Sequence, residues 1–312
     1  MIVKKNNSLI SFKAIIILII IIIIKNLLVK TKLKIVICVI AKQENKYIKE
    51  FIYYYKILGF NKIFLFDNND IDGEQFEKLL TKYIDNNYVE IINFRGFYKP
   101  QKLAYKQCYN NNKYHFDWVA FYDVDEFLYL VKHMNIQEFL SLSIFKKCSS
   151  ILINWKYYGD NNHLFYESKP VLERFQIPFY FPKKSQNSLQ SAAKSIIKRG
   201  LNISWLHFPH YLKSQTICRP NGKIIKAPYF PYFSPDYSIA FIKHFTTKST
   251  EEYADRLIRG TVNSENTSST TYMINRLKLY YFLINKITKS KIDFLEKKLN
   301  IKLKNFFIKN SS

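Results

Sequence analysis

The chain has 312 residues, of which 48% are hydrophobic and 17% aromatic, a composition that excludes a disordered protein and suffices for one large globular domain. Its formal net charge is +24, but the lysines are scattered and accompany an excess of Asn, Ile, Tyr and Phe, so we expect no nucleic-acid binding. The 4 cysteines lie far apart without a Cys-x-x-Cys pair, which indicates neither a zinc ribbon nor a dense disulfide framework.

An apolar segment occupies residues 9–29, and its centre, residues 14–24, is uninterrupted. Lysines at both ends can extend the apolar span, so we predict an uncleaved, single-pass membrane anchor within residues 1–32. A cleaved signal peptide is the alternative, but no small-x-small cleavage site follows the isoleucines. Because lysines flank the segment on both sides, the orientation of the anchor stays open.

Apolar strands alternate with amphipathic helices downstream of this segment. The expected strands are residues 33–40, 62–66, 89–92 and 118–122, and the expected helices are residues 46–58, 74–83 and 101–114. This alternation predicts an α/β fold in which a mostly parallel sheet, built with right-handed crossovers, is flanked by helices. We expect this domain to span residues 33–265. Residues 266–312 predict a lysine-rich helical tail that packs on the domain or lies at a membrane surface.

Three carboxylates follow the fourth expected strand, in the sequence Asp123-Val-Asp-Glu126. In an extended chain Asp123 and Asp125 point to the same face, and two carboxylates held so close repel each other. A hard divalent cation, Mn²⁺ or Mg²⁺, that also binds substrate phosphates relieves this repulsion. The pattern therefore predicts a metal site at the end of this strand.

Two other polar loops are expected at the same edge of the sheet, at residues 41–44 and 67–70, because ligands bind beyond the carboxyl ends of parallel strands. No glycine-rich dinucleotide loop or Walker loop is present, so the sequence indicates neither a dinucleotide oxidoreductase nor a P-loop enzyme. Further along, Ser249 and Glu252 form a capping-box pattern that predicts the start of a helix.

Taken together, these segments resemble a glycosyltransferase of the A-type, Rossmann-like fold, most closely the family 92 and family 2-like group. The matching segments are residues 36–45, 49–52, 58–64, 67–68, 118–127, 153–159, 173–175, 194, 242–253 and 259–260. The chain departs from the group at Phe51, where Trp often follows Glu, and at Lys243, where Asn often precedes the late histidine. The resemblance implies a metal-dependent enzyme that moves a hexose from a nucleotide diphosphate sugar to a hydroxyl of a glycan or glycoconjugate acceptor, with inversion.

The resemblance also implies roles for individual residues. Asp123, Asp125 and His244 are expected to bind the metal, although a lone histidine among aromatic residues is often a packed core residue. Glu126 is interpreted as a residue that orients the loop. The residues expected to contact the nucleotide sugar are Ala41, Glu44, Asp67, Asn68, Gln101, Asp123 and Lys194. For Glu44 and Asp67 the alternative is turn capping, and for Lys194 it is a solvated surface position.

An inverting transferase needs a general base that deprotonates the acceptor hydroxyl. The carboxylates considered for this role are Asp160, Glu167, Glu173 and Asp236. Glu173 is the expected base, and an ion pair with Arg174 is the alternative. Trp155 is expected to provide an aromatic platform for the acceptor sugar, with a position in the core as the alternative.

Other classes of function remain open at this stage. A sugar-phosphate nucleotidyltransferase also uses a metal and a parallel sheet, but normally begins with a glycine-rich phosphate loop that this chain lacks. A glycosidase would use paired carboxylates without metal or nucleotide. A membrane-tethered module that binds a nucleotide sugar or a glycan without turnover is a further alternative.

Overall fold

The computed structural model describes residues 32–98, 100–181, 189, 192–202, 216–225, 234–260 and 269–303. The chain divides into one unit of residues 1–33 and a second, compact unit that begins at Lys34. The expected membrane anchor lies outside the described residues. Within the described residues, no helix combines the length and apolar character that a membrane span requires.

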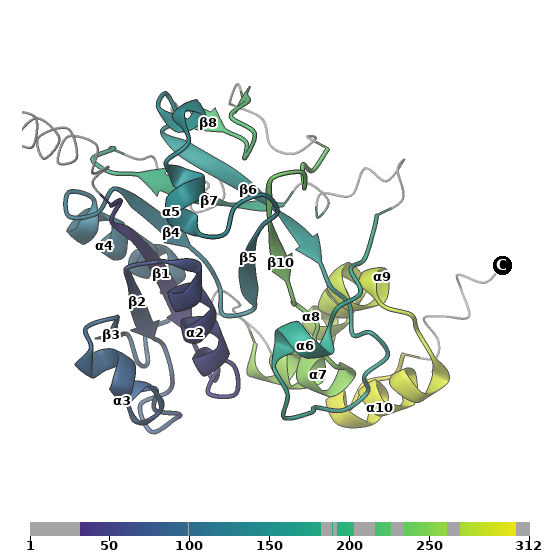
Figure 1. The fold of residues 1–312 in the computed structure, drawn as a ribbon. Helices are drawn as coiled ribbons and strands as arrows, with labels where there is room; N and C mark the ends of the chain where they lie inside the picture. Colours follow the sequence, from purple (N-terminus) through teal and green to yellow (C-terminus); the bar gives the residue numbers. More distant parts are fainter. Residues whose placement is uncertain are drawn as a thin grey trace, which may run out of the picture. The chain divides into compact units, whose positions relative to one another are not determined.

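The first half of the sheet is parallel, as the alternation of strands and helices predicts. Neighbouring strands follow the order β3-β2-β1-β4, and each adjacent pair is parallel (Figure 1). These strands are β1 (Ile35–Ala41), β2 (Lys62–Asp67), β3 (Val89–Asn93) and β4 (Trp118–Phe121), and the helices between them are α2 (Ile48–Leu58), α3 (Glu77–Asp85) and α4 (Gln101–Asn112). Gly59 closes α2 in the left-handed conformation that glycine adopts without strain, at φ 96°.

The second half of the sheet mixes parallel and antiparallel pairs, so the prediction of a mostly parallel sheet is wrong for this half. The order continues β4-β7-β6-β10-β5, in which only β6 and β10 are parallel, and the short strands β8 and β9 extend from β6. These strands are β5 (Glu126–Leu130), β6 (Ser150–Tyr157), β7 (Ala193–Lys198), β8 (Ile217–Cys218), β9 (Ile224–Ile225) and β10 (Ala240–His244).

The described connections in this half explain the difference. They contain only the short helices α5 (Ile136–Leu140), η1 (Ser143–Phe145) and α6 (Val171–Arg174). A regular run of parallel strands needs a full crossover between neighbours, usually a long helix. Strands of this half therefore pair with strands that lie far away in the sequence.

A buried apolar cluster packs helix α4 against strands β1 and β4. On one face of the sheet, the side chains of Val36, Cys38 and Ile40 alternate along β1 and join an apolar cluster with residues of α4. A disulfide between Cys38 and Cys108 crosses this cluster, and a second joins Cys148 to Cys218. The cysteine spacing did not predict either pair.

Helix α2 is anchored by aromatic stacking. The ring of Tyr55 stacks on Tyr122 at 5.4 Å between centroids and on Phe127 at 6.5 Å. The Tyr55 hydroxyl also donates to the backbone carbonyl of Glu126 at 2.8 Å. Because these contacts flank the acidic turn on both sides, they help to fix its position.

Helix α7 (Thr250–Arg259) begins with the predicted capping box, which is confirmed. The Glu252 carboxylate accepts two hydrogen bonds from the Arg174 guanidinium, at 2.7 and 2.9 Å, and one from the Tyr47 hydroxyl at 2.7 Å. This buried group therefore holds α7 against α6 and against the segment that follows β1. Burial alone would raise the pKa of Glu252, but the hydrogen bonds from Arg174 and Ser249 lower that pKa to about 2.

The C-terminal segment is helical and packs on α7. Its helices are α8 (Thr270–Arg276), a π-helical turn (Leu277–Tyr281), α9 (Phe282–Ile284) and α10 (Lys289–Leu299). Tyr253 and Leu257 of α7 share an apolar cluster with Leu277, Leu295 and other residues of this segment, and α7 and α10 lie together in Figure 1.

A buried ion pair also joins this segment to the loop after β6. The Lys291 ammonium lies 2.6 Å from Asp160 Oδ2, which also accepts a hydrogen bond from the Tyr281 hydroxyl at 2.7 Å. The backbone N–H of Asp160 donates to Asn285 Oδ1. A Cβ atom on Gly159 would lie 2.7 Å from both that oxygen and the Ile284 carbonyl oxygen, so this approach requires glycine.

We predict that Lys291→Met destabilises the domain by about 3–5 kcal/mol, because it leaves the buried Asp160 carboxylate without its counter-ion. The measurement is urea unfolding followed by circular dichroism. Lys297→Met on the exposed side of the same helix is the control and should change the free energy of unfolding by less than about 0.5 kcal/mol. Equal effects of the two substitutions would contradict a structural role for this ion pair.

Glu252 provides a test through pH. Its pKa of about 2 in the folded protein lies below the ordinary value of 4.5, so between these values the unfolded chain binds the proton and the folded protein does not. The carboxylate therefore stabilises the fold above pH 4.5, and this contribution is lost as the pH falls toward 2. We expect the difference in unfolding free energy between the wild type and Glu252→Gln to shrink by about 3 kcal/mol over this range. A constant difference from pH 7 to 3 would refute the prediction.

Candidate active site

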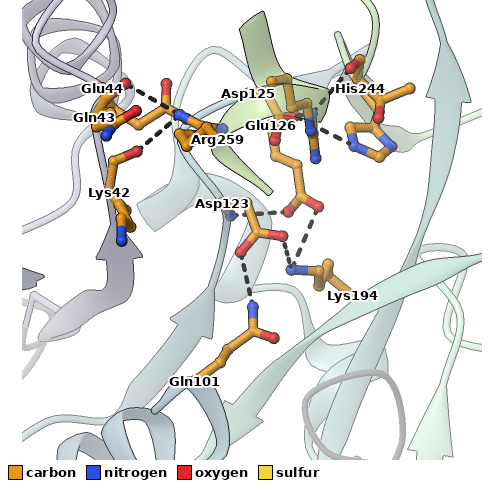
Figure 2. A network of polar contacts seen from close by, with 12 residues as sticks. Lys42, Gln43, Glu44, Gln101, Asp123, Asp125, Glu126, Lys194, His244 and Arg259 are labelled. Atoms are coloured by element: carbon orange, nitrogen blue, oxygen red, sulfur yellow. Dashed lines mark hydrogen bonds and ion pairs between the residues drawn. The ribbon is translucent and has the colours of Figure 1, made fainter. Parts of the chain in front are cut away.

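The three carboxylates lie on a turn between β4 and β5. The backbone N–H of Glu126 donates to the carbonyl oxygen of Asp123 at 3.0 Å, which closes a turn over these four residues. The alternation of side chains in an extended strand therefore does not apply here. Asp123 and Asp125 contact different partners, as Figure 2 shows.

The Asp123 carboxylate faces β7 and α4. Its Oδ2 atom lies 2.9 Å from the Lys194 ammonium, and its Oδ1 atom accepts hydrogen bonds from the Tyr105 hydroxyl at 2.9 Å and from the Gln101 side chain at 3.3 Å. Burial alone would raise the pKa of Asp123, but Lys194 holds it below its ordinary value. The expected residues Gln101, Asp123 and Lys194 are thus brought together.

Glu126 is completely buried and shares the same lysine. Its Oε1 atom lies 3.3 Å from the Lys194 ammonium, and its Oε2 atom accepts a hydrogen bond from the backbone N–H of Asp123 at 3.2 Å. Burial raises the pKa of Glu126 well above its ordinary value, and the neighbouring carboxylates of Asp123 and Asp125 add to this effect, while Lys194 opposes it. The single ammonium of Lys194 therefore serves two carboxylates.

Asp125 points away from Lys194. Its Oδ2 atom lies 2.5 Å from Nη1 of Arg256 in α7 and 3.8 Å from Nε2 of His244. Burial alone would raise the pKa of Asp125, but Arg256 and His244 lower it far below its ordinary value. Asp125 is therefore ionised at neutral pH.

The sheet register places His244 beside the turn. His244 pairs with Glu126 across the antiparallel ladder of β10 and β5, and with Tyr157 across the parallel ladder of β10 and β6. Its ring lies 4.3 Å from Trp155 and 5.2 Å from Tyr157, between centroids. Burial lowers the pKa of His244 to about 4, so the imidazole is neutral at pH 7 and has a lone pair that can bind a metal. His244 thus has both the aromatic packing and the acidic neighbours that the sequence suggests.

Asp125, Glu126 and His244 have the composition and spacing of a metal site. Each offers a ligand atom, and these atoms lie within 4.8 Å of one another. Among the described residues, the buried His244 Nδ1 has no hydrogen-bond partner, and Glu126 Oε1 has only the ion pair with Lys194. Two carboxylates and an imidazole suit a divalent cation. This group includes Glu126, whereas the sequence led us to expect Asp123.

A pocket of about 520 Å³ is lined by Arg256, the ion-pair partner of Asp125. Its walls are the loop of residues 42–47, Asp70 and Glu74, the loop of residues 246–248, and α7. Arg256 lies between the pocket and Asp125. Glu44, one of the residues expected to contact the nucleotide sugar, lines this pocket, and its carboxylate lies 2.8 Å from Arg259. Ala41, another of these residues, is the last residue of β1.

Asp67 and Asn68, also expected to contact the nucleotide sugar, bind the segment of residues 94–97 instead. The Asp67 carboxylate lies 2.6 Å from the Arg95 guanidinium, and the Asn68 side chain donates to the carbonyl oxygens of Phe94 and Phe97. Both side chains therefore support the loop of residues 67–70 from within, as the turn-capping alternative suggests for Asp67.

The expected base and the expected acceptor platform lie in different settings. Glu173 is exposed on α6. Within the part of the chain that the structure describes, no ion pair joins Glu173 to the acidic turn. Its neighbour Arg174 pairs with Glu252, so the alternative ion pair between Glu173 and Arg174 is not formed. Trp155 is largely buried and covers His244.

Sequence reasoning missed two side chains of this site, Tyr105 and Arg256, and it interpreted Glu126 as a residue that orients the loop rather than as a metal ligand. Arg256 had a detectable signal, because it precedes Arg259 by three residues and residues at this spacing share one face of a helix. Tyr105 lies one turn after Gln101 on α4, for which the same rule holds. Nothing in the sequence indicates that Glu126 turns toward His244.

The comparisons with known proteins agree with the family resemblance. The sequence profile of glycosyltransferase family 92 matches residues 34–276. A family 92 protein of Arabidopsis thaliana is 30% identical over 130 residues, which are 41% of this chain and 22% of that protein. One from Ricinus communis is 26% identical over 102 residues, 33% of this chain and 18% of that protein. The chain spans about a fifth of the length of the curated relatives it matches.

Among solved structures, Staphylococcus aureus TarS 1–349 in complex with UDP-GlcNAc has a TM-score of 0.38 and 14% identity, over 89% of this chain and 76% of that chain. A TM-score this low carries no argument about the reaction. The profile match is different, since it extends over most of the described residues and includes the acidic turn, His244 and α7. The chain belongs to glycosyltransferase family 92.

Proposed function

We propose that this chain is a metal-dependent glycosyltransferase that moves a hexose from a nucleotide diphosphate sugar to a hydroxyl of a glycan or glycoconjugate, with inversion. The observation that supports this proposal best is the group of Asp125, Glu126 and His244 beside a pocket of about 520 Å³, in a chain of family 92. The pocket lies at the carboxyl end of β1, where α/β sheets bind ligands.

Acidic residues suit an anionic substrate when they hold a metal ion that neutralises its charge. As the glycosidic bond breaks, negative charge builds on the departing phosphate. A Mn²⁺ or Mg²⁺ ion held by Asp125, Glu126 and His244 would neutralise that charge. Asp123, which Tyr105 and Gln101 hold in place, and its ion-pair partner Lys194 are proposed to contact the donor.

Glu44 and Ala41 are proposed to border the nucleotide base, since the first lines the pocket and the second ends the strand below it. Asp67 and Asn68 are proposed to shape this part of the pocket through their contacts with the segment of residues 94–97. Trp155, which packs on His244, is proposed to form the floor on the acceptor side.

Glu173 remains the proposed general base, because the other candidate carboxylates are engaged elsewhere. Asp160 pairs with Lys291, Glu167 pairs with His163, and Asp236 accepts hydrogen bonds from Ser238. Among the described residues, the Glu173 carboxylate has no ion pair. Glu173 lies on α6, which Arg174 ties to α7 through Glu252.

A screen of nucleotide sugars for metal-dependent release of free nucleotide tests the proposal. We expect Mn²⁺ to support release by the wild type and a chelator to abolish it. Asp125→Asn and Asp123→Asn should each lower the rate by about 100-fold or more, since even partners that only orient metal ligands contribute 10–100-fold. Asp117→Asn, which affects an exposed pair with Arg199 at the start of β4, is the matched control and should keep the wild-type rate.

Two results would contradict the proposal. Turnover that is insensitive to chelator would exclude the metal, and tight binding of a nucleotide sugar without release of nucleotide would indicate a binding module. Glu173→Gln completes the test: loss of transfer with unchanged donor affinity supports its role as the base. Unchanged transfer removes it from that role.

We also propose a location for the domain. Two disulfides, Cys38–Cys108 and Cys148–Cys218, are typical of proteins that fold in an oxidising compartment. Together with the expected anchor in residues 1–32, they support a membrane protein whose domain lies on the non-cytosolic side.

Mass spectrometry of protein alkylated before lysis tests this location. We expect the two cross-linked peptide pairs to dominate, because an oxidising compartment keeps paired cysteines linked. Four alkylated thiols in active protein would contradict the proposal. Carbonate extraction of membranes tests the anchor separately. We expect the intact chain to stay in the membrane fraction.

A further inference from the structure

We propose that Arg256 is an exchangeable counter-ion: it holds Asp125 while the metal site is empty, and it holds the diphosphate of the donor once a divalent cation takes Asp125. This inference rests on the proposed function, because it assigns a ligand within the same site. It goes further in naming the group that recognises the diphosphate and in predicting an order of binding, cation first.

The first observation is that Arg256 and the metal would use the same carboxylate, that of Asp125. Arg256 Nη1 lies 2.5 Å from Asp125 Oδ2, and the same oxygen lies 3.8 Å from His244 Nε2, within the group of three ligands. A cation bound by that group would lie close to the guanidinium and repel it. The two positive charges therefore compete for Asp125.

The second observation is that Arg256 borders the pocket as well as holding Asp125. Its Nη1 atom also donates to the carbonyl oxygen of Thr246 at 2.9 Å, and its side chain is 23% exposed on the pocket side. The guanidinium thus borders the pocket while α7 keeps its position through Glu252 and Arg174. The exchange would therefore move the Arg256 side chain and leave the helix in place.

The third observation concerns Arg259, the other arginine that lines the pocket. Arg259, one turn further along α7, is held by the Glu44 carboxylate and by the carbonyl oxygens of Lys42 and Gln43. None of these groups belongs to the metal ligands, so a bound cation would not release Arg259. A guanidinium binds phosphate oxygens in a bidentate manner, and Arg256 is the guanidinium whose partner the metal would take.

The exchange predicts opposite effects of one substitution on two ligands. In Arg256→Met, Mn²⁺ alone should bind about tenfold more tightly than in the wild type, because a competing positive charge is gone. Inorganic pyrophosphate, added at saturating Mn²⁺, should bind about 10–100-fold more weakly, because charge-assisted hydrogen bonds are lost. Electron paramagnetic resonance measures free Mn²⁺, and calorimetry measures pyrophosphate binding.

Two variants serve as controls. Arg256→Lys keeps the charge without the planar fork, so we expect near wild-type Mn²⁺ affinity with weakened pyrophosphate binding, and this variant still decides the question if Arg256→Met does not fold. Arg259→Met removes a cation of the same helix and should leave Mn²⁺ affinity unchanged. Thermal melting of each variant checks that the fold is retained.

The outcomes separate this inference from the proposed function. If the wild type binds Mn²⁺ but Arg256→Met weakens the binding of both ligands, or leaves Mn²⁺ affinity unchanged, Arg256 is structural and the exchange is wrong. If the wild type binds no Mn²⁺, the metal site itself is wrong and the exchange fails with it. Tighter Mn²⁺ binding together with weaker pyrophosphate binding supports the exchange.

Discussion

The buried carboxylates of the turn between β4 and β5 impose the constraint on which the rest of the site depends. Asp125 and Glu126 have almost no exposed surface, and a buried charge persists only when an opposite charge or a hydrogen bond compensates it. Lys194 from β7 and Arg256 from α7 provide that compensation. The conformation of the turn therefore depends on the packing of strand β7 and helix α7 around it.

Helix α7 connects this constraint to the rest of the domain. Glu252 and Arg256 are four residues apart on it, so one side chain binds α6 and the segment after β1 while the other reaches Asp125. The C-terminal helices pack on the same helix, and Lys291 completes a buried pair with Asp160 beyond β6. Residues that are far from the pocket in sequence thus determine where its cations lie.

The elements of the first half of the domain were predictable because their signals are local. Apolar alternation and the glycine that closes α2 each depend on a few neighbouring residues, and so does the Ser249 capping box further along the chain. Strand direction in the second half was not predictable in this way. It depends on which strands pair, and β10 takes partners that precede it by about 90 to 120 residues.

The sequence by itself determined the strands and helices of the first half of the sheet and the edge at which acidic residues gather, because hydrophobic periodicity is local and parallel strands end together. Only the tertiary structure decided which side chains share a site. The turn directs Asp123 to Lys194, and Asp125 and Glu126 to His244, because side-chain directions in a turn follow its backbone and its distant partners. The same reason explains the cysteine pairs and the contact of Asp67 with Arg95, which spacing along the chain does not encode.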